Sequence, residues 1–95
     1  MAAYIIANIE VIDAAAYEEY RQRVPAIIAA NGGRYLARGG ATTLLEGDTA
    51  PNRLVILEFP DMDHLKAFYH SAEYRPLIAM RKRAARGSLI AIEGV

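Results

Sequence analysis

The chain has 95 residues, 54% of them apolar, and its eleven basic and eleven acidic side chains give a formal net charge of zero. This length and composition predict one domain over residues 1–95 with a hydrophobic core. The balanced charge argues against a nucleic-acid partner or an anionic membrane surface, since both favour strongly basic proteins.

The chain contains no cysteine, which excludes disulfide bonds, thiol chemistry and cysteine-ligated metals. Residues 1–12 are apolar, but they lack a basic start and are interrupted by Asn8 and Glu10, so they do not resemble a signal peptide. No apolar run approaches the length of a transmembrane helix. We therefore expect a cytoplasmic protein without a membrane partner.

The first third of the chain predicts a strand followed by a helix. Residues 4–11 are rich in β-branched side chains, which favour a strand. Asp13 is a helix N-cap, and a helix is expected from about residue 14 to residue 30, passing through Pro25. Its apolar stripe recurs at three- and four-residue steps and comprises Tyr17, Tyr20, Val24, Ile27 and Ile28. Asn31 and the two glycines after it end the helix.

Two glycine pairs bracket the next predicted strand, residues 34–38. Simple alternation along a strand predicts that Arg34, Leu36 and Arg38 share one face. The pair Gly39-Gly40 is then either a tight hairpin turn or a bulge in one long bent strand. We favour the bulge, with extended structure resuming over residues 41–46 before a turn.

The second half of the chain predicts a strand, two helices and a last strand. Residues 53–59 are apolar on both faces, as in a central strand. Asp61 caps a short helix, and Ser71 begins a longer one that Gly87 ends. Residues 88–93 form the final strand.

The longer of these helices is strongly basic. Its stripe is expected to point Tyr74, Leu77, Ile78 and Arg81 inward. Five of the eleven cations lie in or beside it, and their ordinary interpretation is a solvated surface near the negative end of the helix dipole: Arg75, Arg81, Lys82, Arg83 and Arg86.

This order of elements predicts an α+β fold of the ferredoxin-like (βαββαβ) type, an antiparallel sheet with helices on one face. The residues expected to face the helices are Ile5, Ala7, Ile9, Val55, Leu57 and Phe59. The opposite face holds Tyr4, Ile6, Leu36, Leu54 and Ile56. Because that face is too apolar to remain in water, we expect a homodimer formed through it.

Several short motifs carry a resemblance to a known family. They are Val24-Pro25, residues 33–40, Leu45-Glu46-Gly47, Glu58-Phe59-Pro60 and Ser71-x-x-Tyr74. The chain resembles the domain of unknown function 1330 family, which belongs to the dimeric α+β barrel superfamily. The resemblance implies a ferredoxin-like protomer and a dimer whose two sheets face each other. Superfamily relatives include cofactor-free monooxygenases, muconolactone isomerases and haem-degrading enzymes, so it implies no single activity.

Arg38 and Glu58 form the first candidate site. Each lies near the end of an apolar strand, and pairing of neighbouring strands could bring them together. Arg38 would bind a carboxylate or enolate, and Glu58 would act as general base. The structural alternative is an ion pair between Arg38 and Glu46 or Glu58. Tyr20 and Tyr74 are expected near Arg38 as further substrate-binding residues.

His64 and His70 are the only histidines, and each is a candidate general base. Their spacing of six residues does not place them on one helix face, so we expect no metal site. The glycine pairs flank a strand and do not open a helix, which argues against a phosphate loop. No cofactor is expected.

Two hypotheses remain open. One is a cofactor-independent enzyme that binds a small carboxylated or enolisable molecule between sheet and helices. The other is a non-catalytic dimeric binding or stress-associated module whose polar pairs are structural. An Arg38 that faces an open pocket supports the first, and an Arg38 sealed and paired with carboxylates supports the second.

Overall fold

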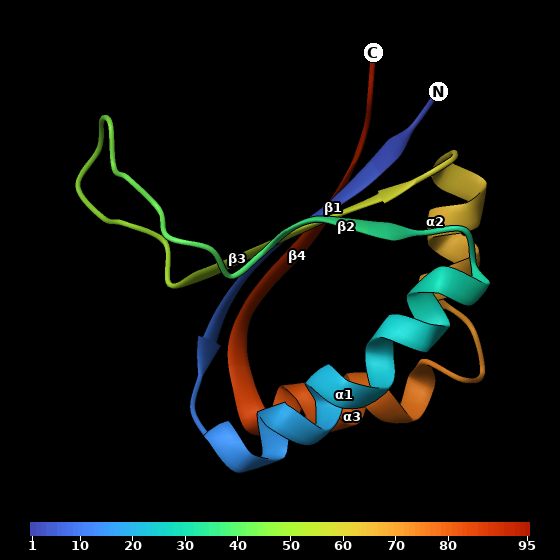
Figure 1. The fold of residues 1–95 in the computed structure, drawn as a ribbon, viewed down its shortest axis with the longest axis horizontal. Helices are drawn as coiled ribbons and strands as arrows, with labels where there is room; N and C mark the ends of the chain where they lie inside the picture. The colour runs from blue at the N-terminus through green and yellow to red at the C-terminus, as the bar shows by residue number, and fades with distance from the viewer.

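The computed structural model describes residues 1–95 and contains one four-stranded antiparallel sheet with three helices. The strands are β1 (Ala3–Val11), β2 (Arg34–Arg38), β3 (Arg53–Phe59) and β4 (Ala85–Glu93), in the order β2-β3-β1-β4. The helices are α1 (Ala14–Ala30), α2 (Met62–Tyr69) and α3 (Arg75–Ala84). All three lie on one side of the sheet (Figure 1), which confirms the predicted ferredoxin-like α+β fold.

Local capping explains where the first two helices begin. The Asp13 side chain accepts a hydrogen bond of 3.1 Å from the backbone N–H of Ala16 at the start of α1. Asp61 accepts one of 2.8 Å from the backbone N–H of His64 at the start of α2. Each bond satisfies a backbone donor that a helix N-terminus leaves free. None of the three helices is long and apolar enough to cross a membrane.

The core lies between the sheet and the helices. The predicted strand residues Ile5, Ala7, Ile9, Leu57 and Phe59 are all buried there, and Val55 packs against them. The helices contribute aromatic side chains, of which Phe68 and Tyr74 have ring centroids 4.4 Å apart. The alternation seen in the sequence therefore identified the buried face of the sheet correctly.

The connection between β2 and β3 differs from its prediction. Residues 41–46 form no strand, and the whole connection from residue 39 to 52 projects from one end of the sheet (Figure 1). The bulge lies earlier than expected, because Tyr35 pairs with Leu57 whereas Ala37 pairs with the adjacent Ile56. Leu36 is thus the extra residue, inside β2 and before the second glycine pair.

The last strand is also longer than predicted. It begins at Ala85, directly after α3, and includes Gly87. Its full length pairs with β1, from Ala85 opposite Val11 to Glu93 opposite Ala3. Pairing with a neighbouring strand, which the local sequence does not reveal, extends the strand past the glycine that was expected to end the helix.

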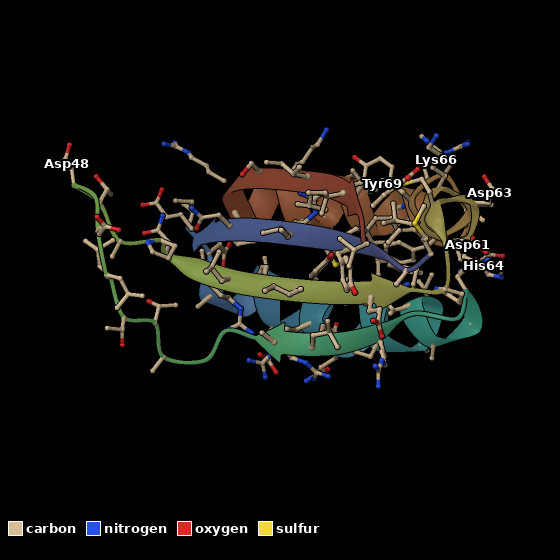
Figure 2. The ribbon with its side chains drawn as sticks, turned by 90° about the horizontal axis from the view of Figure 1, so that it is seen from above. Asp48, Asp61, Asp63, His64, Lys66 and Tyr69 are labelled. Atoms are coloured by element: carbon tan, nitrogen blue, oxygen red, sulfur yellow. The ribbon has the colours of Figure 1, made fainter.

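The face of the sheet without helices, here called the open face, is apolar (Figure 2). It carries Tyr4, Ile6, Leu54, Ile56, Ile90 and Ile92. Ile6 is 38% exposed, Ile90 60% and Ile92 51%. Three isoleucines on one exposed sheet face exceed what single scattered apolar residues would explain.

Candidate functional site

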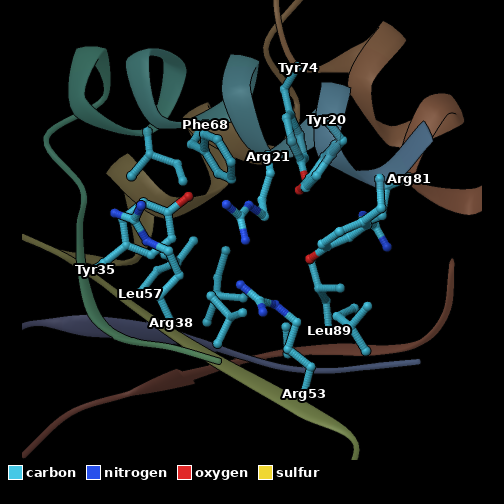
Figure 3. Close-up of a pocket in the computed structure, with 16 residues that line it drawn as sticks. Tyr20, Arg21, Tyr35, Arg38, Arg53, Leu57, Phe68, Tyr74, Arg81 and Leu89 are labelled. Atoms are coloured by element: carbon cyan, nitrogen blue, oxygen red, sulfur yellow. The ribbon is translucent and has the colours of Figure 1, made fainter. Parts of the chain in front are cut away.

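A cavity of about 40 Å³ lies between the sheet and the helices (Figure 3). That space is comparable to the room taken by about three water molecules. Its wall is largely apolar, but the polar side chains in it are of two kinds, tyrosines and arginines: Tyr17, Tyr20, Tyr35, Tyr74, Arg21, Arg38, Arg53 and Arg81. The cavity therefore contains the three predicted binding residues Arg38, Tyr20 and Tyr74.

The bulge at Leu36 directs Arg38 to this cavity. Arg34 pairs with Glu58, whose side chain lies on the open face, whereas Arg38 pairs with Val55, which faces the helices. In a regular strand, residues four apart share a face of the sheet. One extra residue between them moves the second residue to the opposite face. The expectation that Arg34 and Arg38 share a face is therefore wrong.

Arg38 makes no ion pair, so the structural alternative, a pair between Arg38 and Glu46 or Glu58, is not formed. Glu58 instead binds Arg34, with 2.6 Å between its Oε1 and the arginine Nε. The Arg38 guanidinium lies over the ring of Tyr35, 3.6 Å from the centroid. Burial raises the pKa of the Tyr35 hydroxyl, although the Arg38 charge opposes this. The exposed Arg38 thus remains available to an anion.

Arg81 and Arg53 carry buried nitrogen atoms without a partner. Arg81 is 8% exposed, in agreement with its predicted inward position and in contrast to the solvated surface expected for its basic cluster. Its Nε has no hydrogen-bond partner in the chain, and neither does the buried Nε of Arg53. A buried charge without a counter-ion is strongly destabilising. Both arginines line the cavity, so an anion there would supply the missing partner.

Gly39 explains how Arg53 fits beside β2. Its backbone has a φ of +66°, and its N–H donates a 2.7 Å hydrogen bond to the carbonyl of Leu54. A Cβ at this position would overlap the Arg53 guanidinium. Gly39, the first residue of the second glycine pair, therefore leaves space for the side chain of Arg53, which lines the cavity.

The hydroxyls of Tyr20 and Tyr74 are 2.8 Å apart and buried. Burial raises the pKa of Tyr20 far above its ordinary value, and Tyr74 raises it further, so this hydroxyl stays protonated. Figure 3 shows both hydroxyl ends directed toward the cavity. Because one hydroxyl donates to the other, the second keeps a proton that it can donate to a ligand.

The predicted proton-transfer residues lie elsewhere. Glu58 is on the open face, bound to Arg34. His64 is exposed, with its Nδ1 2.7 Å from Oδ1 of Asp61 at the end of the molecule opposite the 39–52 connection (Figure 2). His70 is exposed and lines a separate open groove between α2 and β4. The backbone and side-chain hydrogen bonds from His64 lower the pKa of Asp61.

The cavity wall therefore offers hydrogen-bond donors and positive charge. It contains no Asp, Glu or His side chain, so the wall provides none of the usual general bases. No group of three His, Asp or Glu side chains in the chain could hold a metal ion. Such a wall suits an oxyanion, whose oxygens accept hydrogen bonds and carry the opposite charge.

Sequence reasoning missed Arg21 and Arg53 as cavity residues and did not assign Arg81 a ligand role. A signal was present for two of them. Arg53 lies two residues before Val55, in phase with the buried face of β3, and Arg81 lies on the inward stripe of α3. A cation in phase with a buried face needs a counter-charge, so it is a candidate site residue when no carboxylate shares that phase.

Solved structures with the same fold confirm this architecture. The chain superposes on a protein of unknown function from Rhodopseudomonas palustris with a TM-score of 0.79 and 18% identity, covering 99% of this chain and 82% of the other. For SnoaB, a cofactor-independent oxygenase from Streptomyces nogalater, the values are 0.69 and 17%, covering 99% and 93%. For a dimeric ferredoxin-like protein of unknown function from Jannaschia sp. CCS1 they are 0.67 and 15%, covering 99% and 100%.

These identities establish similarity of fold, which does not carry an activity with it. Comparison with curated proteins gives no match. The model of one family does match, over residues 2–95, and its description is "Domain of unknown function (DUF1330)". This match extends across the whole sheet and all three helices, and the chain belongs to the DUF1330 family.

Proposed function

We propose that this protein binds a small organic anion, carboxylated or enolisable, in the cavity between the sheet and the helices. The observation that carries the proposal is Arg81, a buried arginine that lines the cavity and whose Nε has no partner in the chain. Arg38 and Arg53 line the same cavity and also make no ion pair. An anionic ligand would neutralise charges that the protein itself leaves uncompensated.

A cofactor-independent enzyme is the catalytic form of this proposal. Arginine and tyrosine donors stabilise negative charge that develops on an enolate oxygen. Because the wall has no carboxylate or imidazole, the substrate would have to enter already ionised or be acidic enough to ionise on binding. The oxygenase activity named for the Streptomyces neighbour belongs to that protein and is a starting point for assays here.

The second candidate is a non-catalytic binding module. The absence of a carboxylate or imidazole base from the cavity wall favours it over an enzyme that must abstract a proton. The two candidates share the same ligand and differ in whether the ligand is consumed. Incubation of a bound compound with the protein, followed by product analysis, separates them.

The binding proposal is tested by thermal unfolding in the presence of small carboxylic and hydroxy-aromatic acids. A ligand that binds the folded state raises the unfolding midpoint by mass action. We expect such a rise for the native protein and for Arg83→Met, which removes an exposed arginine of α3. We expect no rise for Arg81→Met. An equal rise in Arg81→Met would show that the acid binds outside the cavity and would contradict the proposal.

We also propose that the protein is a homodimer formed through the open face. The support is the exposure of Ile6, Ile90 and Ile92 on that face, together with the dimeric form named for the Jannaschia neighbour. Packing two such faces together removes apolar surface from water and would enclose the Arg34–Glu58 ion pair near the seam.

A further inference from the structure

We infer that the ligand of this cavity is a short dicarboxylate, with one negative group at each end of the cavity. This inference rests on the proposed anion-binding function and specifies its ligand.

The cavity holds three arginines without an ion pair. Arg38, Arg53 and Arg81 have no carboxylate partner, whereas Arg21 shares an exposed ion pair with Glu18, with 3.4 Å between Nε and Oε2. A ligand with a single negative charge would leave at least two of the three unpaired guanidinium groups uncompensated. Two negative charges balance the site better, because one can compensate the buried Arg81 and the half-buried Arg53, whose desolvation cost remains when they are unpaired, while the second forms a charge-assisted contact with the exposed Arg38.

The placement of the charges separates two anionic positions. In Figure 3, Arg81 lies at one end of the cavity and Arg38 at the other, with the tips of Arg21 and Arg53 between them. The ends also differ in depth, since Arg81 is buried and Arg38 is exposed. Guanidinium groups bind carboxylates through two parallel hydrogen bonds, which requires each carboxylate to sit directly against its arginine. One compact anion cannot meet that condition at both ends.

The size of the cavity limits the chain between the two carboxylates. Its volume of about 40 Å³ leaves room for a few ligand atoms beyond those at the exposed end. The inner carboxylate at Arg81 would fill this volume, and a short chain such as that of succinate or glutarate would extend the outer carboxylate toward the exposed Arg38.

The experiment measures affinities by calorimetry for butyrate, succinate, glutarate and inorganic phosphate at one ionic strength. We expect succinate or glutarate to bind about ten-fold or more tightly than butyrate, as an additional charge-assisted contact warrants. Arg38→Met should abolish this preference and change butyrate affinity by less than about two-fold. Arg81→Met should weaken both classes of acid.

Arg34→Met is the matched control, because Arg34 lies on the same strand but on the open face. This substitution should change neither the affinity for butyrate nor the affinity for the dicarboxylates. If butyrate binds as tightly as the dicarboxylates and Arg81→Met abolishes both, the inference fails and the binding proposal stands. Tighter binding of phosphate than of either dicarboxylate also overturns the inference. If none of the four compounds binds and the wider set of acids raises no midpoint, the binding proposal itself fails.

Discussion

The two faces of the sheet differ in whether their arginines have carboxylate partners. On the open face, Arg34 is bound to Glu58 and the surrounding side chains are apolar. On the helix face, Arg38 and Arg53 have no carboxylate partner, and Arg81 of α3 joins them without one. A charge that already has a partner is more easily covered by another protein surface than a charge without one, whereas a buried unpaired charge is stabilised by an anion that compensates it. The faces are therefore suited to different partners.

A single extra residue makes this division possible. Arg34 and Arg38 belong to one five-residue strand, and a regular strand would place Arg38 opposite Leu54 on the open face. The bulge at Leu36 places it opposite Val55, toward the helices. The motif bracketed by two glycine pairs thus contributes one arginine to each face.

The largest expected effect is a loss of dimer affinity, caused by a substitution on the open face. Ile6→Asp puts a charge at the centre of that face and should weaken the proposed dimer by about 100-fold or more, because the carboxylate would be buried without a partner. Sedimentation velocity measures the change, and anion affinity should be retained. Ile12→Asp is the control, since Ile12 is 54% exposed and lies outside the sheet. A dimer that survives Ile6→Asp would place the interface elsewhere.

On the helix face, Arg81→Met should stabilise the ligand-free protein. Replacing a buried uncompensated charge with an apolar side chain of similar length is expected to raise the free energy of unfolding by about 1–2 kcal/mol. Urea denaturation measures this, with Arg83→Met changing stability by less than about 0.5 kcal/mol. A marked loss of stability in Arg81→Met would mean that the arginine has a structural role, and the contrast between the two faces would weaken.

Gly39→Ala tests the link between the glycine pair and the cavity. Alanine at a positive φ costs about 1 kcal/mol, and its Cβ would displace Arg53. We expect lower stability and weaker anion binding, with the dimer unchanged. Gly40→Ala is a close control, because a Cβ at Gly40 meets no atom within 4 Å. Equal behaviour of the two variants would show that Arg53 does not depend on Gly39.

The smallest expected effect is on the pH dependence of stability, and it concerns Asp61, which lies on neither face of the sheet. Hydrogen bonds from His64 lower the pKa of Asp61, so its stabilising contribution is present above the pKa of the unfolded chain and is lost as pH falls through the lower folded value. Asp61→Asn keeps a capping oxygen but cannot titrate, so it should slightly reduce the loss of folding stability at acid pH. Unfolding midpoints between pH 5 and about 2 measure it. Anion affinity at neutral pH should not change, and a change there would connect this end of the molecule to the cavity.

The sequence predicted the features that depend on local pattern. The limits of α1, β2 and β3 agree with their periodicity and flanking turn residues, and Asp13 and Asp61 are the caps that were expected. The expected open face is also apolar in the structure. In each case a few neighbouring residues carry the information.

What the sequence could not predict depends on pairing between distant strands. The side on which Arg38 lies follows from the bulge, and the partner of Glu58 follows from the register of β2 against β3. Residues 41–46 have strand-forming composition but pair with no neighbouring strand, so they remain irregular. The cavity itself combines residues from all four strands and all three helices, and no local pattern brings these together.

The unpartnered Arg81 has a consequence for how long the protein survives in a cell. Under the proposed function, the chain without ligand carries a buried charge that favours opening, and proteases degrade the opened form. A bound anion would stabilise the folded state and slow this degradation. The amount of protein would therefore rise with the supply of its ligand, even at a constant rate of synthesis. The cellular half-life of the native chain would then report ligand concentration, and that of Arg81→Met would not.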